Sequence, residues 1–261
     1  MKKTHISLNL SDYPEKLRKY LSDCEVFDSS CSPQAKVLFA NKDGGYYIKS
    51  AAAKKLAKEA DMTGYFHQKG LATEVLEYFC DEKDWLVTRA LRGDDCTAPK
   101  YLDDPKRLCD VLAERLRYLH SLDARDCPDQ SRMNTYIETV CQNYEKGVFD
   151  PLCFTDKASK MTVDEAFKYF YDNRSALDSG TLIHGDYCLP NIILDDWKFS
   201  AFIDLDNAGV ADPHIDLFWG VWTLKFNLKT DKYTSRFLDA YGRELVDTNK
   251  LLMIECAEAF G

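Results

Sequence analysis

One stretch of the sequence combines the side chains that phosphoryl transfer to a hydroxyl group requires. His184, Asp186 and Asn191 form the pattern H-x-D-x-x-x-x-N, and Asp204 follows a short apolar run further along. A carboxylate can accept the proton of an attacking hydroxyl, whereas an amide oxygen and a second carboxylate are ligands for Mg²⁺. Each residue alone would be typical of a turn or a strand end. Their combination predicts that Asp186 is the catalytic base and that Asn191 and Asp204 bind the metal.

Short apolar runs on either side of residues 195–198 predict the hairpin that would bring the two metal ligands together. Its strands are expected at 191–194 and 200–203, and a further strand at 181–183 leads into the histidine motif. Residues 149–160 lack a regular pattern and predict an irregular link. Apolar residues at helical spacing predict helices at 105–122, 136–144, 163–177 and from Ile215 onward.

The first part of the chain has the pattern of a small β-rich lobe. Runs at 35–39 and 46–49 flank an Asn-Lys-Asp-Gly-Gly turn and predict a hairpin. A helix at 51–66 and strands at 71–79 and 85–91 are predicted to follow. An Arg-Gly-Asp-Asp segment then breaks the pattern. We therefore expect one lobe over 1–92 and a second, mostly helical lobe with the catalytic hairpin over 93–261.

Composition limits the classes of function. The 261 residues contain 34 Lys and Arg against 43 Asp and Glu, a net charge of −9. Such a chain can bury a large core, and its summed field repels nucleic acid and favours cationic partners. The segment from Asp178 to Asp216 contains eight Asp and a single Lys, whereas the first sixty residues contain eleven Lys and Arg against seven Asp and Glu. A basic first lobe suits phosphate, and the acidic segment suits a metal ion or a cationic substrate.

Cysteine usage and hydropathy predict a cytoplasmic protein. The ten cysteines include no Cys-x-x-Cys pair, which favours reduced thiols over a disulfide framework. No apolar stretch reaches the roughly 18–20 residues of a membrane-spanning helix, so no membrane partner is expected. Four histidines lack metal-ligand spacing and are predicted to be surface or core residues: His5, His67, His120 and His214.

At this point the chain resembles the aminoglycoside O-phosphotransferases of the 3′ type, within the protein-kinase-like superfamily, over about residues 20–260. Besides the first motif, the resemblance rests on Phe-Ile-Asp-Leu around Asp204, on Gly-Val-Ala-Asp ending at Asp212, and on Asp216. It implies an α+β, bilobal protein-kinase-like fold: a small β-rich N-lobe with one main helix, a hinge, and a larger, mostly helical C-lobe, with ATP between the lobes. It also implies that Asp216 braces the catalytic segment and that His184 positions it.

The resemblance assigns three residues of the first lobe to the nucleotide. Lys49 is similar to the lysine that binds the α- and β-phosphates, although a lone strand lysine would ordinarily be a surface residue. Glu59 is similar to its ion-pair partner, with pairing to Lys55 on the same helix as the alternative. Tyr47 is similar to the aromatic residue that stacks on adenine, with a plain core role as the alternative.

Two further segments are implied to contact the nucleotide. Ser32 lies in a segment similar to the nucleotide-positioning loop, where backbone N–H groups and a hydroxyl can contact phosphate. Arg89 and Leu91 lie in a segment similar to the hinge, whose backbone would pair with the adenine edge. The absence of a G-x-G-x-x-G motif agrees with this family and counts against a protein kinase proper.

The match is weaker where a cationic drug would bind. Residues 222–227 contain no acidic side chain, so one anionic wall of the family is missing, and Asp206 adds a carboxylate after the metal strand. The resemblance leaves these residues as substrate contacts: Asp150, Asp156, Glu255, Glu258 and Gly261 with its terminal carboxylate. Exposed helix acids without a function are the alternative for the two glutamates.

The expected activity is therefore transfer of the γ-phosphoryl group of ATP, with GTP as an alternative donor and Mg²⁺ as the metal, to the 3′-hydroxyl of a cationic aminoglycoside. Such a reaction would confer antibiotic resistance. Two other hypotheses remain: a metabolic kinase of the same fold acting on choline, homoserine or a sugar, with Trp219 and Trp222 as material for an aromatic cage, and a catalytically silent ATP-binding module. A monomer or a weak dimer is expected.

Overall fold

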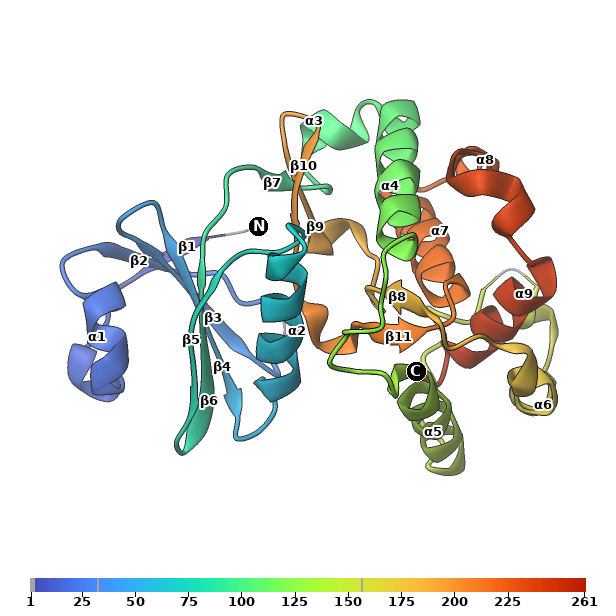
Figure 1. The fold of residues 1–261 in the computed structure, drawn as a ribbon, viewed down its shortest axis with the longest axis horizontal. Helices are drawn as coiled ribbons and strands as arrows, with labels where there is room; N and C mark the ends of the chain where they lie inside the picture. The colour runs from blue at the N-terminus through green and yellow to red at the C-terminus, as the bar shows by residue number, and fades with distance from the viewer. Residues whose placement is uncertain (1–2, 32, 156) are drawn as a thin grey trace. The chain divides into compact units, whose positions relative to one another are not determined.

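The computed structural model describes residues 3–31, 33–155 and 157–261, and contacts within it divide the chain into two units (Figure 1). Unit 1 comprises Met1–Asp95 and Ile192–Asp206, and unit 2 comprises Cys96–Asn191 and Asn207–Gly261. The hairpin after Asn191, which the sequence pattern assigns to the second lobe, thus makes most of its contacts with the first unit.

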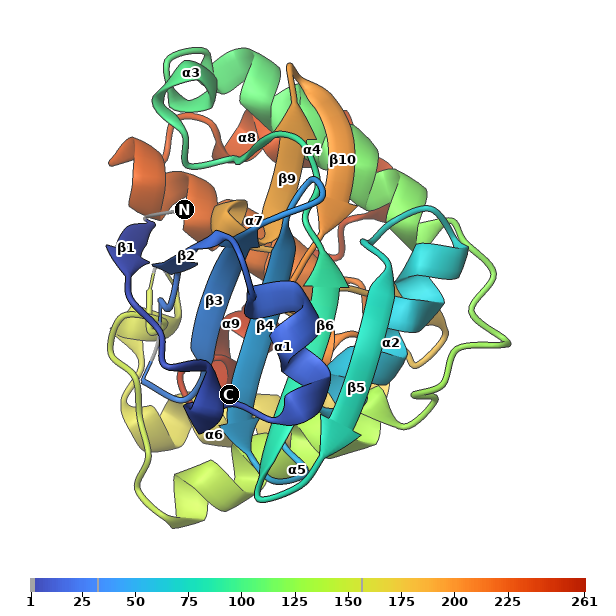
Figure 2. The ribbon, with the colours of Figure 1, turned by 90° about the vertical axis from the view of Figure 1, so that its left-hand side faces the viewer.

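Unit 1 contains a six-stranded antiparallel sheet in the order β1-β2-β3-β4-β6-β5 (Figure 2). Its strands are β1 (Thr4–Ile6), β2 (Glu25–Asp28), β3 (Lys36–Asn41), β4 (Tyr46–Ala52), β5 (Val75–Cys80) and β6 (Lys83–Arg89). The predicted hairpin is confirmed as β3 and β4, joined by a turn in which Asp43, Gly44 and Gly45 have positive φ. The first two strands have no predicted counterpart because they are short and rich in polar residues.

One helix covers each face of this sheet (Figures 1 and 2). Successive strand residues point to opposite faces, so Tyr46 and Ile48 pack with Leu17 of α1 (Glu15–Leu21). Leu86 packs on the other face with Ala60 of α2 (Ala57–Gln68).

Two element boundaries in unit 1 differ from the predicted ones. Helix α2 begins at Ala57 rather than at residue 51, because β4 continues to Ala52 by pairing with Lys83 of β6. Strand β5 begins at Val75 rather than at residue 71. Leu71 instead accepts a backbone hydrogen bond from Phe202 at 2.8 Å.

The predicted hairpin around residues 195–198 is confirmed. It consists of β9 (Ile192–Asp195) and β10 (Lys198–Phe202), in which Ile192 pairs with Phe202. Asp196 and Trp197 both have positive φ, as a tight turn between strands requires. The short strand β7 (Asp94–Asp95) pairs with β9, which explains why the hairpin belongs to unit 1.

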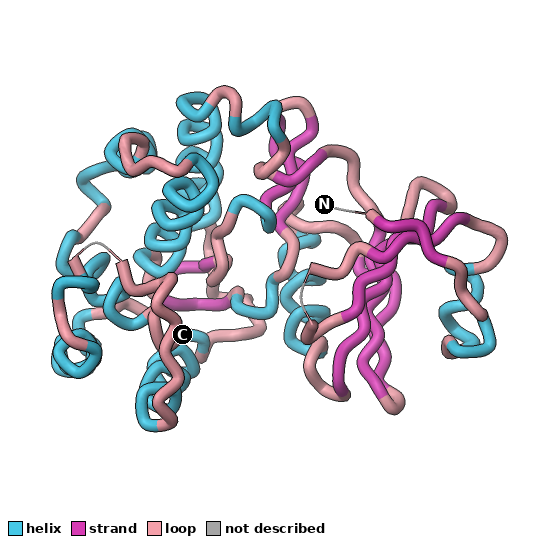
Figure 3. Tube along the Cα trace, turned by 180° about the vertical axis from the view of Figure 1, so that it is seen from behind, coloured by secondary structure: helices cyan, strands magenta, loops and turns pink. Residues whose placement is uncertain are grey.

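Unit 2 is mostly helical (Figure 3). Its helices are α3 (Pro99–Leu102), α4 (Pro105–His120), α5 (Arg132–Glu145), α6 (Val163–Asn173), α7 (His214–Leu228), α8 (Thr234–Gly242) and α9 (Thr248–Ala257). The predicted helix from residue 105 is confirmed, with the side chain of Asp104 as its N-cap. Helix α5 begins before the predicted residue 136, and α6 ends before residue 177 in a short 3₁₀ turn, Arg174–Ala176.

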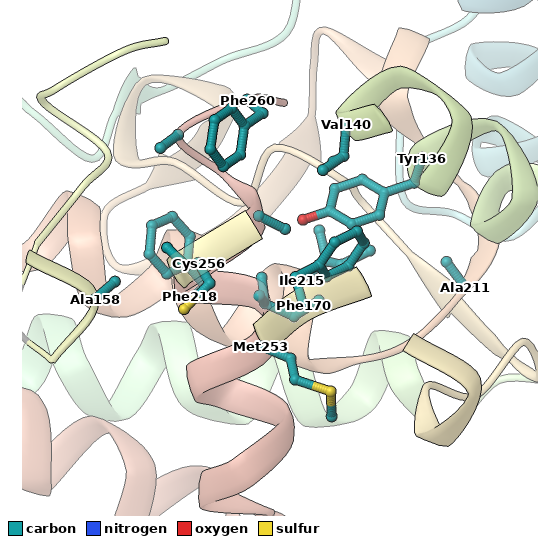
Figure 4. Packing of buried hydrophobic residues seen from close by; sticks show 14 of the residues in the cluster. Tyr136, Val140, Ala158, Phe170, Ala211, Ile215, Phe218, Met253, Cys256 and Phe260 are labelled. Carbon is teal, nitrogen blue, oxygen red and sulfur yellow. The ribbon is translucent and has the colours of Figure 1, made fainter. Parts of the chain in front are cut away.

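A two-stranded antiparallel sheet, β8 (Thr181–Ile183) with β11 (Gly209–Ala211), lies beside the helical core of unit 2. Tyr136, Phe170, Ile215 and Phe260 belong to this core, which joins α5, α6, α7 and the segment after α9 (Figure 4). The ten cysteines form no disulfide. Among the described residues, no helix has the length and apolar character that crossing a bilayer demands.

Candidate active site

The loop after β8 is held by hydrogen bonds from a helix of the same unit. Oδ2 of Asp216 on α7 accepts from the backbone N–H of His184 at 2.8 Å, and Oδ1 accepts from Gly185 at 2.7 Å. Asp216 is fully buried. These bonds fix the backbone immediately before Asp186, which is the bracing contact that the family resemblance implies.

Gly185 is required at its position by two features of the backbone. Its φ of +80° lies in the left-handed region. A Cβ atom at this position would also lie 2.0 Å from the carbonyl oxygen of Asn207. A larger residue would therefore displace either the loop that contains Asp186 or the segment after Asp206.

A histidine whose side chain is only 5% exposed supports the same carboxylate. Nε2 of His120, at the end of α4, lies 3.1 Å from Oδ2 of Asp216, and Nδ1 lies 2.8 Å from the hydroxyl of Tyr241 on α8. Carboxylate oxygens accept hydrogen bonds, so the tautomer with its hydrogen on Nε2 is the one that makes this contact. The prediction of a core or surface histidine is confirmed, but the link to Asp216 was missed because 96 residues separate the two.

Asp186 and Asn191 are joined directly. Nδ2 of Asn191 donates to Oδ2 of Asp186 at 2.8 Å and to its backbone oxygen at 3.1 Å. Both bonds use the NH₂ group of Asn191, so its carbonyl oxygen, the atom that Mg²⁺ prefers, takes no part in them. Burial, followed by the charge of Asp186, raises the pKa of the nearby Cys188 thiol well above its ordinary value, so this thiol stays protonated beside the carboxylate.

In unit 1, a single ammonium group lies between two carboxylates. Nζ of Lys49 on β4 is 2.8 and 2.9 Å from the two carboxylate oxygens of Glu59 on α2 and 2.8 Å from Oδ1 of Asp204. Burial alone would lower the pKa of Lys49, but the two carboxylates outweigh it and raise the pKa above the ordinary value. Burial raises the pKa of Glu59 to about 7 despite Lys49, and Asp204 adds to the increase.

Asp204 is the exposed member of this group. Its side chain is 50% exposed, compared with 7% for Glu59. Its φ of +55° is uncommon for a residue other than glycine, and such local strain is concentrated at functional positions. Asp206 is also exposed, and its charge contributes to the raised pKa of Glu59.

A cavity of about 290 Å³ in unit 1 brings together most of the predicted nucleotide residues. Its lining includes Tyr47, Lys49, Glu59, Arg89, Leu91 and Asp204. The ring of Tyr47 packs 5.1 Å from that of Phe39, so an aromatic wall and an ammonium group share the cavity. Ser32 lies outside the described residues, next to Cys31, which also lines the cavity.

The backbone of Arg89 already has partners within the protein. Its N–H donates to the carbonyl oxygen of Glu74 at 3.1 Å, and its carbonyl accepts from the hydroxyl of Thr73. The Arg89 N–H is therefore engaged, which weakens the expectation that it pairs with a base. Its side chain lines the cavity instead.

The two predicted C-terminal acids are buried. Glu255 accepts from the backbone N–H of Ala158 at 3.1 Å, and Glu258 accepts from the hydroxyl of Tyr136 at 2.9 Å. Their exposed fractions are 8% and 4%. Burial raises the pKa of Glu258 to about 8, against the hydrogen bond from Tyr136 and with a contribution from the charge of Asp186. Both acids thus hold unit 2 together, whatever they contribute to a ligand.

Asp150 presents an exposed carboxylate on a loop that is fixed at both ends. Its backbone N–H donates to Ala259 at 2.8 Å, and its Oδ1 accepts from Leu152 N–H at 2.9 Å. The carbonyl oxygen of Leu152 accepts from the indole N–H of Trp222 at 3.0 Å. Gly261 is also exposed, whereas Asp156 lies outside the described residues.

Aromatic rings occupy the helix segment that lacks acidic residues. The rings of Trp222 and Phe226 stack with centroids 4.9 Å apart and an interplanar angle of 8°. Trp219 meets Trp222 edge-on at 5.4 Å. Phe226 is 49% exposed. Helix α7 therefore presents an aromatic surface beside the Asp150 loop.

A braced carboxylate–amide pair in unit 2 and a cavity with a paired lysine in unit 1 are the features that the sequence motifs predict for a phosphotransferase. A profile of the phosphotransferase enzyme family matches residues 27–251, and the chain belongs to that family. It is 46% identical over 257 residues to a probable aminoglycoside 3′-phosphotransferase of Lactococcus lactis, covering 98% of each chain. It is 30% identical over 168 residues to an aminoglycoside 3′-phosphotransferase of Niallia circulans, covering 64% of each.

Solved structures confirm the kinase-like α+β fold. An aminoglycoside 3′-phosphotransferase of type VIII matches with a TM-score of 0.78 and 24% identity, over 97% of this chain and 99% of that one. An aminoglycoside phosphotransferase of Streptomyces rimosus, solved in complex with ADP and streptomycin, matches with a TM-score of 0.67 and 21% identity over 98% and 100%.

Proposed function

We propose that this phosphotransferase moves the γ-phosphoryl group of ATP, with Mg²⁺, to the 3′-hydroxyl of an aminoglycoside of the kanamycin or neomycin type. The observation that carries the proposal is the Asp186–Asn191 pair at 2.8 Å, because it joins a base to an amide metal ligand. The names of its relatives, aminoglycoside 3′-phosphotransferases, supply the substrate and the hydroxyl.

The donor atoms fit a magnesium nucleotide. Asn191 and Asp204 offer an amide and a carboxylate oxygen, the hard ligands that Mg²⁺ takes together with phosphate oxygens and water. The described part of the chain contains no cluster of three or more His, Cys, Asp or Glu residues suited to a metal. When bound, the ion neutralises charge on the phosphates. Lys49, held by Glu59, would bind the non-transferred phosphates.

Asp186 would orient the acceptor hydroxyl and take its proton. The two backbone bonds to Asp216 and the bond from Asn191 limit the motion of this carboxylate, so little reorganisation is needed at the moment of transfer. Tyr47 would stack on the purine. GTP stays an alternative donor in this proposal.

The acceptor would bind through charge and aromatic contacts on unit 2. Asp150 offers an exposed carboxylate to an ammonium group, and Gly261 is exposed beside the same segment. Trp222 and Phe226 take the place of the acidic wall, since aromatic faces attract ammonium groups by about 0.5–2 kcal/mol. The resulting phosphorylated drug would carry added negative charge, which is the basis of the expected resistance.

A coupled ADP-release assay over a panel of aminoglycosides tests the proposal. Kanamycin should be turned over, whereas tobramycin, which has no 3′-hydroxyl, should bind without being phosphorylated. Turnover of tobramycin at the rate of kanamycin would reject the 3′ position.

The aromatic surface of α7 also favours one second candidate, a choline kinase, because Trp219, Trp222 and Phe226 could surround a quaternary amine. Choline and kanamycin are therefore assayed side by side. Phosphorylation of choline but not of kanamycin would select the second candidate. ADP release that no acceptor stimulates would instead indicate a nucleotide-binding module.

A further inference from the structure

The cavity of unit 1 contains a buried serine hydroxyl without a hydrogen-bond partner. Ser29 follows β2 directly and is 3% exposed. Its Oγ has no hydrogen bond to any residue within 3–31, 33–155 or 157–261. Ser29 also lines the same cavity as Lys49. Buried hydroxyl groups are nearly always hydrogen-bonded, because an unpaired one loses the bonds that water gave it. This exception therefore requires an explanation.

The backbone around Ser29 is well ordered by pairing, so the unpaired hydroxyl is not a consequence of a loose loop. Its N–H donates to the carbonyl oxygen of Val37 at 2.8 Å, which extends the β2–β3 ladder by one step beyond Asp28 and Leu38. The next residue, Ser30, is exposed, and its Oγ accepts from Val37 N–H at 2.9 Å. The two adjacent serines thus differ. The hydroxyl of Ser30 accepts a hydrogen bond from the neighbouring strand, whereas the hydroxyl of Ser29 makes none within the described residues.

The register of the sheet places Ser29 in line with the phosphate-binding lysine. Val37 stands opposite Ser29 on one side and opposite Lys49 on the other, and Lys49 stands opposite Leu86. Residues directly opposite in antiparallel strands share a face. All four residues line the cavity, which confirms that they share this face. Ser29 and Lys49 are two strand spacings apart, about 10 Å along the row.

We propose that the hydroxyl of Ser29 donates a hydrogen bond to a phosphate oxygen of the bound nucleotide. The proposal rests on the proposed function, because it takes the cavity as the nucleotide site. A hydroxyl can donate to phosphate, and hydrogen bonds to charged oxygens are stronger than those between neutral groups. Lys49, on the same face of the sheet, is the proposed binding group for phosphate. The polyphosphate chain is the charged and extended part of the nucleotide, so it is the part that can contact both Lys49 and Ser29. The ligand thus supplies the partner that the free protein lacks.

If Ser29 binds the nucleotide, its removal should weaken nucleotide binding without lowering the stability of the free protein. A purely structural role would predict the opposite. Ser29→Ala removes an unpaired buried hydroxyl, so the melting temperature of the free protein should stay the same or rise. Binding of MgADP to the full chain, measured by calorimetry, should weaken about 10-fold, the loss typical of one hydrogen bond to a charged group. Binding of adenosine should not change.

Ser30→Ala is the matched control. It removes a hydroxyl from the same loop that does bond to the backbone, so the melting temperature should fall while the affinity for MgADP stays close to that of the wild type. Wild-type affinity for MgADP in Ser29→Ala, an equal loss for adenosine, or a lower melting temperature would each overturn the assignment. Failure of the wild-type chain to bind MgADP would instead reject the nucleotide site, and with it the proposed function.

Discussion

The side-chain amide of Asn191 donates a hydrogen bond to Oδ2 of Asp186 at 2.8 Å. One residue thereby has two tasks, since its NH₂ group holds the proposed base and its carbonyl oxygen is the proposed metal ligand. The proposed base is also fixed from its N-terminal side, because Asp216 holds the two preceding backbone N–H groups. Substitutions at these three positions should therefore have separable effects.

Asp186→Asn should abolish most of the chemistry and keep nucleotide binding. An amide cannot accept the hydroxyl proton, so turnover of kanamycin should fall about 10²–10⁴-fold, the range for loss of a general base. Affinity for MgADP should stay near the wild-type value, since Lys49 and its partners lie elsewhere in the chain. The measurements are ADP release and calorimetry. Asp172→Asn, at an exposed position on α6, is the control. Turnover within a few-fold of the wild type in Asp186→Asn would show that Asp186 is not the general base.

Asp216→Asn should lower both stability and turnover. The carboxylate is fully buried and accepts from His184, Gly185 and His120, and an amide would direct an NH₂ group at one of these donors. A loss of about 2–4 kcal/mol in the free energy of unfolding is expected. Urea unfolding measures it, with turnover recorded under native conditions. Unchanged stability would show that the backbone bonds do not depend on the charge.

The local pattern of the sequence predicted the elements that carry the site. Two tight turns with recognisable residues, at Asn41 to Gly45 and at Asp196 to Trp197, marked the hairpins, and α4 had both a cap and a regular apolar face. These features are encoded by neighbours in the chain. The strands β1 and β2 were missed because they are short and rich in polar residues, so their own pattern gives no clear strand signal.

Contacts between distant residues account for what the sequence could not show in the site. The bond between His120 and Asp216 depends on how α4 packs in unit 2, and the burial of Glu258 depends on Tyr136 in α5. Neither pair has a spacing that could be recognised. The motif at Asp186 could be predicted because its base and its amide ligand are only five residues apart.

Glu258→Gln should make stability less dependent on pH. The pKa of Glu258 is raised to about 8 in the folded chain, against an ordinary value of 4.5. The folded state therefore binds this proton more tightly, and its contribution to stability is complete below pH 4.5 and is lost as the pH rises to about 8. Glutamine has no charge to bury and can still accept from Tyr136. Relative to the wild type, the variant should gain stability over this interval, on the order of a few kcal/mol.

Melting temperatures of both proteins from pH 5 to pH 9 measure this gain. Glu165→Gln is a suitable control. Glu165 is exposed and its pKa is lowered by its hydrogen bonds to Thr162, so its contribution is complete above its ordinary pKa and constant over this interval. A difference between wild type and Glu258→Gln that does not vary with pH would show that Glu258 is ionised throughout.

Trp222→Ala should weaken binding of the aminoglycoside without affecting the nucleotide. The indole stacks on Phe226 and fixes the Asp150 loop through its bond to Leu152, so its removal takes away an aromatic face and loosens an exposed carboxylate. The KM for kanamycin should rise about 10-fold, in the range for loss of one desolvated cation–π contact, and the KM for ATP should stay constant.

Trp222→Phe separates the two contributions, because phenylalanine keeps a ring face but cannot donate to Leu152. If the ring binds the drug, this variant should recover most of the affinity. If the tether to the loop matters more, it should resemble Trp222→Ala. Tyr118 is an exposed aromatic residue on a different helix, α4, so Tyr118→Ala controls for the general effect of removing an aromatic side chain from the surface. A kanamycin KM equal to that of the wild type in Trp222→Ala would show that α7 lies outside the acceptor site. The ammonium groups of the drug would then have to bind elsewhere, with Asp150 as the remaining candidate.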